Sequence, residues 1–239
     1  MLKKYIFSII FLILGLSIFA QKPKVKNKPE YDDKPIHFGY TLGINVMDFT
    51  FDRAYFPSPT SFNSPDTIYA DLGSKTLGFQ VGMIADMRLG EYFNLRILPS
   101  FNFGQRNLIF TSNGKSQPPM KLESSMLDFP VLIKYKAKRI NNYRPYLIGG
   151  GSVRYDLAAK KKFDDSQSIY VLLKPLDFYY EMGFGIDYYF PYFKFSTELK
   201  LSIGMLDVLN HKKSTQHPEY VASLRQLNSN IVMFSIHFE

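Results

Sequence analysis

Apolar and polar residues alternate along much of the chain, and the segment from Phe193 to Met205 shows the pattern clearly. Its odd positions are apolar apart from Thr197, and its even positions are charged or small. A period of two is typical of a β-strand with one apolar face. The same pattern recurs in eight segments, which we interpret as strands: 36–47, 75–88, 92–103, 127–136, 144–158, 176–189, 193–205 and 230–238.

The connections between these segments alternate in length. Three are short and four are long; the short ones are 89–91, 139–142 and 190–191, and the long ones are 48–74, 111–125, 158–174 and 207–226. Long loops at one end and short turns at the other are the layout of an up-and-down transmembrane barrel. The sequence therefore predicts an all-β fold, an eight-stranded antiparallel up-and-down transmembrane β-barrel with both chain ends on the short-turn side.

The sizes of the side chains on the two faces decide which face meets lipid. Alternation would also suit a soluble eight-stranded barrel with an apolar interior, such as a lipocalin. The interior of an eight-stranded barrel is just wide enough for side chains to fill. The apolar face carries bulky Phe, Leu, Ile, Tyr and Met residues, whereas the polar face is rich in Gly, Ser and Thr. We therefore expect the bulky face to point outward, where so much exposed apolar surface requires lipid rather than water.

Charged residues of both signs fall on the face that this orientation turns into the lumen. Buried charge is costly unless it is paired. We therefore predict a salt-bridged polar plug rather than an open pore, with a proton or ion path as the alternative. The predicted lumen network comprises Asp86, Arg88, Arg96, Asp128, Lys134, Arg154, Asp156, Glu181, Asp187, Lys194, Glu198 and Lys200.

The N-terminus indicates export. Residues 1–20 combine two lysines, an apolar run and Ala20 in the manner of a cleaved signal peptide, with an uncleaved membrane anchor as the alternative. The chain has no Cys, which excludes lipid anchoring through a cysteine. We therefore expect the outer membrane as the location, with its lipid as the surrounding partner.

The remaining chain divides into a leader and the barrel. Residues 21–35 are charged and proline-rich, which predicts a flexible basic leader; the alternative is that its lysines dock on an acidic periplasmic partner or on lipid head groups. Residues 36–239 are predicted to form the outer-membrane barrel. The net charge is +8, but no nucleic-acid motif is present, so we expect no nucleic-acid partner.

Candidate catalytic and ligand-binding residues are few. His37 and His237 fall on lumen-facing positions of the first and last strands, so we expect a hydrogen-bonded pair and no metal site. His211, His217 and Asp207 share the last long loop, where an active site is the alternative to an ordinary polar loop. We expect a non-enzymatic protein with no cofactor and no small-molecule substrate.

Three consecutive glycines occupy positions 149–151 within the fifth segment. Neither Lys-Ser/Thr nor a helix follows them, which excludes a phosphate-binding loop. Gly149 and Gly151 fall on the lipid-facing side. We predict a shallow groove there for a partner helix or a lipid, with local curvature as the alternative.

The segments LDFPVLIKYK (127–136) and RPYLIGGGSVRYDLA (144–158) resemble motifs of the outer-membrane β-barrel families of the Bacteroidota. With the lysine-rich leader and the chain length, they are most similar to the PorT group, called SprT in gliding bacteria. The resemblance implies an accessory component of the type IX secretion system, with protein partners in a secretion complex and a role in motility in gliding species. It brings no catalytic residues. The alternatives are a free-standing small barrel for adhesion or envelope integrity, a loop-based outer-membrane enzyme, and a narrow pore.

Overall fold

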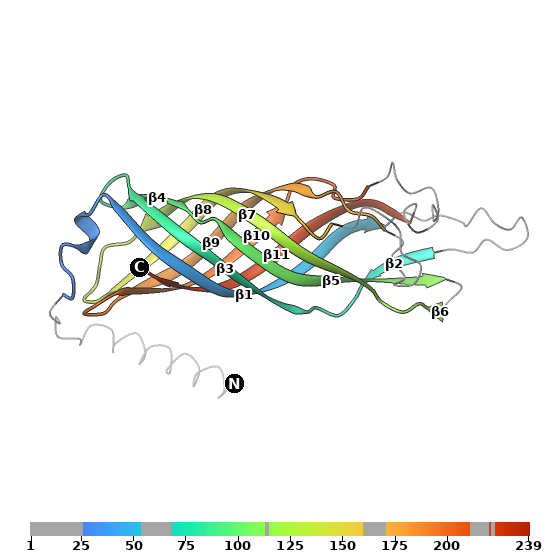
Figure 1. Ribbon diagram of the computed structural model, residues 1–239, viewed down its shortest axis with the longest axis horizontal. Coiled ribbons are helices and arrows are strands. Elements are labelled where there is room, and N and C mark those ends of the chain that lie inside the picture. Colours follow the sequence, from blue (N-terminus) through green and yellow to red (C-terminus); the bar gives the residue numbers. More distant parts are fainter. Residues whose placement is uncertain (1–25, 54–67, 113–114, 160–170, 211–219, 221–222) are drawn as a thin grey trace, which may run out of the picture.

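The computed structural model describes residues 26–53, 68–112, 115–159, 171–210, 220 and 223–239, so the signal peptide predicted over 1–20 lies outside the described residues. These residues form an elongated barrel (Figure 1). No helix in the described ranges is long and apolar enough to cross a membrane. The elements are η2 (Tyr31–Asp33), β1 (Ile36–Arg53), β2 (Ile68–Leu72), β3 (Leu77–Arg88), β4 (Phe93–Ile97), β5 (Ser100–Ser112), β6 (Lys115–Ser116), β7 (Met120–Lys136), β8 (Tyr143–Asp156), β9 (Leu176–Tyr189), β10 (Lys194–Gly204) and β11 (Leu224–Phe238).

Antiparallel pairing carries the sheet around a closed ring. The order is β1, β11, β10, β9, β8, β7, then β4 with β5, then β3, which pairs with β1 again. β4 and β5 share one place in the ring because both pair with β3 on one side and with β7 on the other. The described strands therefore fill eight places, and the predicted fold class is confirmed.

Prolines divide the third predicted strand into β4 and β5. Pro99 lies in the gap between them, and the amide of Leu98 donates to the carbonyl of Pro130 on the neighbouring β7. Proline has no amide hydrogen to give to a ladder. The hydrogen bonding is therefore interrupted, while the register against β7 is the same on both sides of the gap.

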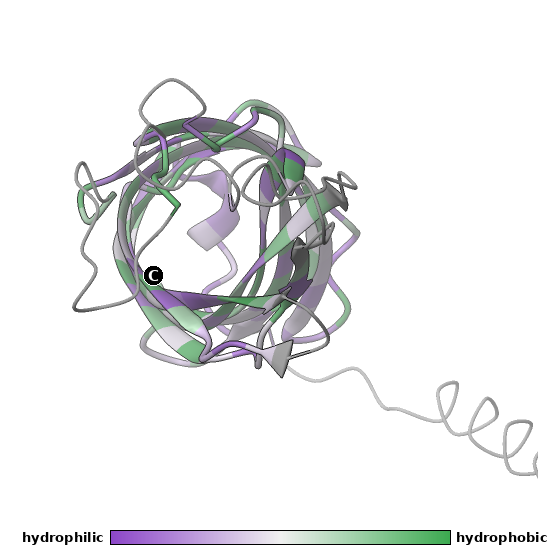
Figure 2. Ribbon diagram, turned by 90° about the vertical axis from the view of Figure 1, so that its right-hand side faces the viewer, coloured by the Kyte–Doolittle hydropathy of each residue, from purple (hydrophilic) through white to green (hydrophobic). Residues whose placement is uncertain are grey.

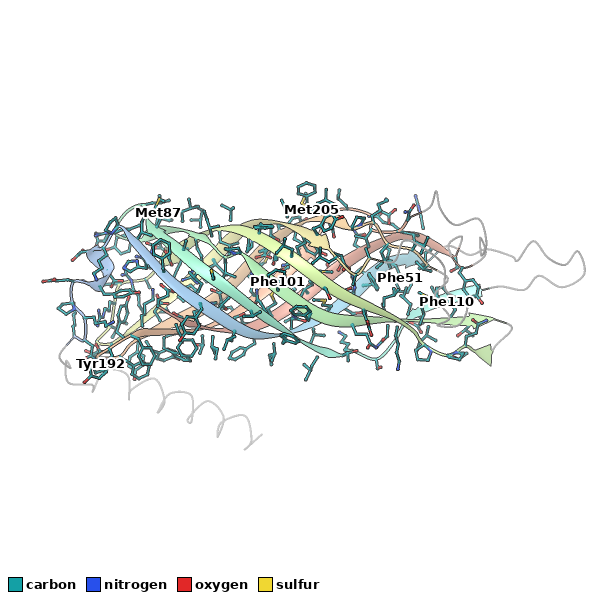
Figure 3. The ribbon with its side chains drawn as sticks, in the orientation of Figure 1. Phe51, Met87, Phe101, Phe110, Tyr192 and Met205 are labelled. Atoms are coloured by element: carbon teal, nitrogen blue, oxygen red, sulfur yellow. The ribbon has the colours of Figure 1, made fainter. Side chains whose placement is uncertain are left out.

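Through most of the barrel the bulky apolar side chains point outward and the polar ones point inward, as predicted. Figure 2 shows hydrophobic and hydrophilic residues alternating along the strands of the ring. In Figure 3, Phe101 and Met205 lie along the barrel wall, where both are exposed, and Tyr192 lies at the short-turn end. Tyr192 is 88 % exposed, which is typical of the aromatic girdle that flanks the apolar band of transmembrane barrels.

Toward the long-loop end the pattern reverses, so that apolar side chains point inward and polar side chains point outward. β1, β5, β7 and β11 continue past the ends predicted for them, and β2 and β6 add to β5 there (Figure 1). Met120 and Leu122 of β7 are buried inside, whereas Lys121 and Glu123, which alternate with them, are exposed. The inward side chains pack into one cluster, which we call the outer apolar cluster: Phe49, Ala70, Leu108, Phe110, Met120, Leu122, Val171, Leu173, Val208, Leu209, Leu224 and Leu227.

The long loops predicted over 48–74, 111–125 and 207–226 are therefore wrong wherever strands occupy them. In these parts of the strands the outward positions have passed the lipid and meet water, so they are polar, and the apolar side chains turn inward. A period-two pattern whose apolar phase reverses is easily mistaken, in the sequence, for the end of a strand.

Candidate functional site

The lumen is filled by buried ionic side chains in three groups, and the group nearest the short-turn end is centred on Arg96. Its guanidinium contacts three carboxylates: Asp86 (Nη2–Oδ2 2.8 Å), Glu198 (Nη1–Oε2 3.1 Å) and Glu239 (Nη2–Oε1 3.2 Å). Lys194 approaches the other oxygen of Glu239 (Nζ–Oε2 2.6 Å). The side chains that Arg96 joins are at most 1 % exposed, so water screens none of these charges.

Two further chains of contacts extend this group. Lys134 holds both oxygens of Asp187 (2.9 and 2.8 Å from Nζ), and Ser196 donates to the same carboxylate (2.6 Å). The hydroxyl of Tyr146 donates to Glu198 (2.9 Å), and its ring lies 3.8 Å below the ammonium of Lys134. Each charge therefore has a partner of opposite sign and further polar or aromatic contacts, as a buried ion pair requires.

The middle group is built on Arg154 of β8. Its Nε lies 3.0 Å from Oδ2 of Asp128, and its Nη2 pairs with Glu181. Lys200 approaches the second oxygen of Glu181 (Nζ–Oε2 2.7 Å), and Ser202 donates to the first (2.9 Å). These contacts link the inner faces of four neighbouring strands, β7 to β10.

The third group meets the outer apolar cluster. Arg106 of β5 pairs with Asp156 (Nη2–Oδ2 2.9 Å) and donates to Ser229 (3.0 Å). Its guanidinium carbon lies 4.5 Å from the ring centroid of Phe49, a member of that cluster. The lumen therefore carries the three ionic groups from the short-turn end to Arg106, together with two small buried apolar clusters, and it is apolar beyond Arg106. The two small clusters are Met47, Met126, Ile231 and Met233, and Leu132, Tyr146 and Ile148.

Eleven of the twelve residues predicted for the lumen network lie in these groups, and Arg88 does not. Arg88 lies at the short-turn mouth, where it pairs with Asp33 (3.0 Å), whose side chain is 71 % exposed. Arg106 and Glu239 also belong to these groups but were not among the residues predicted from the sequence. Both continue the lumen-facing phase of their strands, Arg106 beyond the predicted end of its segment and Glu239 after the last apolar residue; that phase was the signal available.

His37 and His237 do not form the predicted pair. β1 and β11 are neighbours, but His237 lies opposite Thr41 and contacts its hydroxyl (Nδ1–Oγ1 2.9 Å), with Nε2 3.3 Å from Glu198. His37 is four positions away, with Nε2 2.7 Å from the carbonyl oxygen of Tyr31 and its ring stacked on that of Tyr31. Strand adjacency was predicted, whereas the register that separates the two imidazoles was not.

Other candidate chemistry of the sequence does not come together. His211 and His217 lie outside the described residues. Asp207 accepts hydrogen bonds from the amides of Leu209 and Leu227 (3.1 and 3.0 Å), which joins two segments of the long-loop end. Within the described part of the chain, no group of three or more His, Cys, Asp or Glu side chains is arranged to hold a metal ion.

The second half of the leader is docked on the short-turn mouth, in contrast to the flexible leader predicted over 21–35. Asn27 donates from its amide to Oδ1 of Asn142 (2.8 Å) and from its side chain to the carbonyl of Tyr189 (2.9 Å). Arg139 donates to the carbonyls of Asn27 and Lys28. All of these partners lie more than one hundred residues further along the chain, so composition alone gave no sign of them.

The short helix η2 continues this docked segment (Figure 1). Asp32 pairs with Arg144 (3.0 Å) and accepts a hydrogen bond from the hydroxyl of Tyr189 (2.8 Å). Tyr31 lies against His37 and meets Tyr189 edge-on. Burial raises the pKa of the Tyr31 phenol, so this side chain stays neutral beside the lumen.

Two adjacent glycines of β8, Gly149 and Gly150, differ in how closely the neighbouring strands approach them, so alanine substitutions at the two positions form a matched pair. A Cβ at Gly149 would have one neighbour, the carbonyl oxygen of Glu181 at 3.9 Å, whereas a Cβ at Gly150 would collide with the carbonyl of Val131 and lie 2.9 Å from Cα of Leu132. Gly150→Ala is therefore expected to lower the free energy of unfolding by about 1–3 kcal/mol. Gly149→Ala should change it by less than about 0.5 kcal/mol.

Urea titration of the refolded barrel in detergent measures both variants. Equal midpoints for the two would contradict the close approach of β7 and β8 at Gly150. The groove predicted at Gly149 and Gly151 stays a prediction, and a Cβ at Gly151 would lie 3.3 Å from the carbonyl of Tyr179.

Comparison with known proteins identifies a family and solved structures that are similar to this chain. Residues 19–210 match the family described as outer membrane protein beta-barrel domain. The outer membrane protein OprG from Pseudomonas aeruginosa is similar at 11 % identity over 85 % of this chain and 95 % of that chain, with a TM-score of 0.48. Neisserial surface protein A is similar at 10 % identity over 85 % and 98 %, with a TM-score of 0.45. The comparison with curated proteins finds no match. Since the family match spans most of a chain that folds as a closed ring with a lipid-facing exterior, the chain belongs to the outer membrane protein beta-barrel domain family and is an outer-membrane protein.

Proposed function

We propose that this protein is a non-enzymatic accessory component of the type IX secretion system, acting in assembly, docking or stabilisation of the complex. The observation that carries the accessory part is the closed lumen: buried ion pairs and small apolar clusters fill it up to Arg106, and the outer apolar cluster lies beyond. A filled barrel acts through its surfaces rather than as a conduit. The resemblance of 127–136 and 144–158 to the PorT group supports the choice of complex and of protein partners within it.

Deletion of the gene tests the secretion role. We expect cargo with a C-terminal signal domain to disappear from the secreted proteins, and gliding to be lost in a gliding species, with both restored by the full-length gene. Normal secretion in the deletion strain would contradict the proposal. The free-standing barrel for adhesion or envelope integrity would then be the better function.

A conductance measurement tests the closed lumen separately. The purified barrel in a planar bilayer is expected to give no steady channel, because the charges that would line a pore are paired with one another across it. Steady single-channel currents would contradict the closed lumen and favour the narrow pore.

A further inference from the structure

The short-turn mouth holds a pocket of about 280 Å³, which we call the mouth pocket. The docked leader forms one wall, and the turns that follow β3 and β7 form the others; the residues that matter here are Lys26, Asp33, Arg88, Lys138 and Arg139. In outer-membrane barrels the short turns face the periplasm and the long loops face outward. The mouth pocket therefore opens to the periplasm.

The walls of the mouth pocket are fixed to one another. Arg139 binds two leader carbonyls, Asp33 pairs with Arg88 of β3, and Asp32 pairs with Arg144 of β8 (both 3.0 Å). A ligand would not have to order these walls, so binding would not carry that entropic cost.

The mouth pocket has an excess of positive charge. Two of its three carboxylates, Asp32 and Asp33, are already paired with arginines. Lys26 and Lys138 are exposed and have no ion-pair or hydrogen-bonding partner among the residues that the structure describes. The lining holds five cationic side chains against three carboxylates: Lys26, Arg88, Lys138, Arg139 and Arg144 against Asp32, Asp33 and Glu91.

We propose that the mouth pocket binds an acidic peptide segment of a periplasmic partner, whose carboxylates pair with Lys26 and Lys138. Its size suits a few side chains of an extended segment rather than a folded domain. Lipid is disfavoured because the pocket lies at the mouth of the lumen rather than on the lipid-facing outside of the barrel. Of the two partners considered for the leader lysines, an acidic periplasmic partner and lipid head groups, this proposal selects the acidic periplasmic partner. The inference rests on the proposed function only for the setting of the partner, since the binding itself needs purified protein alone.

The test uses the full chain in a neutral detergent and a fluorescein-labelled hexaglutamate peptide, followed by fluorescence anisotropy. The double variant Lys26→Glu/Lys138→Glu is expected to bind about tenfold more weakly than the unmodified protein. The matched control, Lys121→Glu/Arg225→Glu, makes the same change of charge on exposed positions at the long-loop end and should leave the affinity unchanged. A hexaglutamine peptide should not bind, and added salt should weaken the hexaglutamate complex.

Three results would overturn the mouth pocket as a peptide site. They are an absence of hexaglutamate binding, an equal loss in the two double variants, and displacement of the peptide by phosphatidylglycerol vesicles but not by neutral vesicles. The gene deletion tests the secretion role independently: normal secretion would overturn that role and leave the binding result standing.

Discussion

Arg96→Ala is expected to lower the free energy of unfolding by about 3–5 kcal/mol, a large share of the roughly 5–15 kcal/mol that stabilises a typical domain. The guanidinium is the shared partner of Asp86, Glu198 and Glu239. Without it, three buried carboxylates face one another with less positive charge between them. Removing one partner of a buried pair costs more than the pair contributed, because the remaining charge stays out of water.

Urea titration in detergent, together with the shift of the folded barrel on unheated gels, measures this loss. The control is Arg88→Ala, the same substitution at an ion pair whose Asp33 side chain is 71 % exposed. Exposed pairs contribute about 0–1 kcal/mol, so this variant should unfold close to the unmodified protein. Similar midpoints for the two alanine variants would show that the lumen network does not hold the barrel together.

The barrel body could be predicted from the sequence because lipid imposes a strict rule on it. On β7, Phe129, Val131 and Ile133 face outward while Asp128 and Lys134 face the lumen. An unpaired polar group facing hydrocarbon is costly, so the outward positions of the spanning stretch are apolar almost throughout, whereas the inward positions also admit apolar residues such as Leu132. The phase of one strand therefore indicates its orientation.

The parts that could not be predicted depend on contacts between distant segments. The register that separates His37 from His237 is set by the pairing of β1 with β11, which the apolar pattern does not specify. Asn27 is ordered by Asn142 and Tyr189, far along the chain. The outer apolar cluster could not be predicted because its part of the strands follows the pattern of water-exposed sheets, with apolar residues inside. This pattern is the opposite of the one in the adjacent membrane-spanning part of the same strands.

Because the inward side chains are apolar at the long-loop end and largely ionic at the short-turn end, the two ends of the barrel are expected to unfold separately. Leu227 of the outer apolar cluster is fully buried, and its amide donates to the carboxylate of Asp207 (3.0 Å). Leu227→Asp would place a second carboxylate in apolar surroundings, at a cost on the order of 3 kcal/mol or more. We expect the long-loop end to open, so that trypsin cuts after Lys121 and Arg225, while the barrel still shows its folded position on unheated gels.

Gln226→Asp is the control, because it adds the same carboxylate at the adjacent, exposed position of β11. Because position 226 pairs with Asp52 of β1, the added charge should lower stability by less than about 1 kcal/mol and create no new cleavage. The members of the outer apolar cluster are distinct from the ionic groups around Arg96 and Arg154, so opening one end removes no ion pair from the other. If Leu227→Asp instead abolishes the folded position on the gel, the two ends form one cooperative unit, and the ionic lumen cannot hold the ring without its apolar extension.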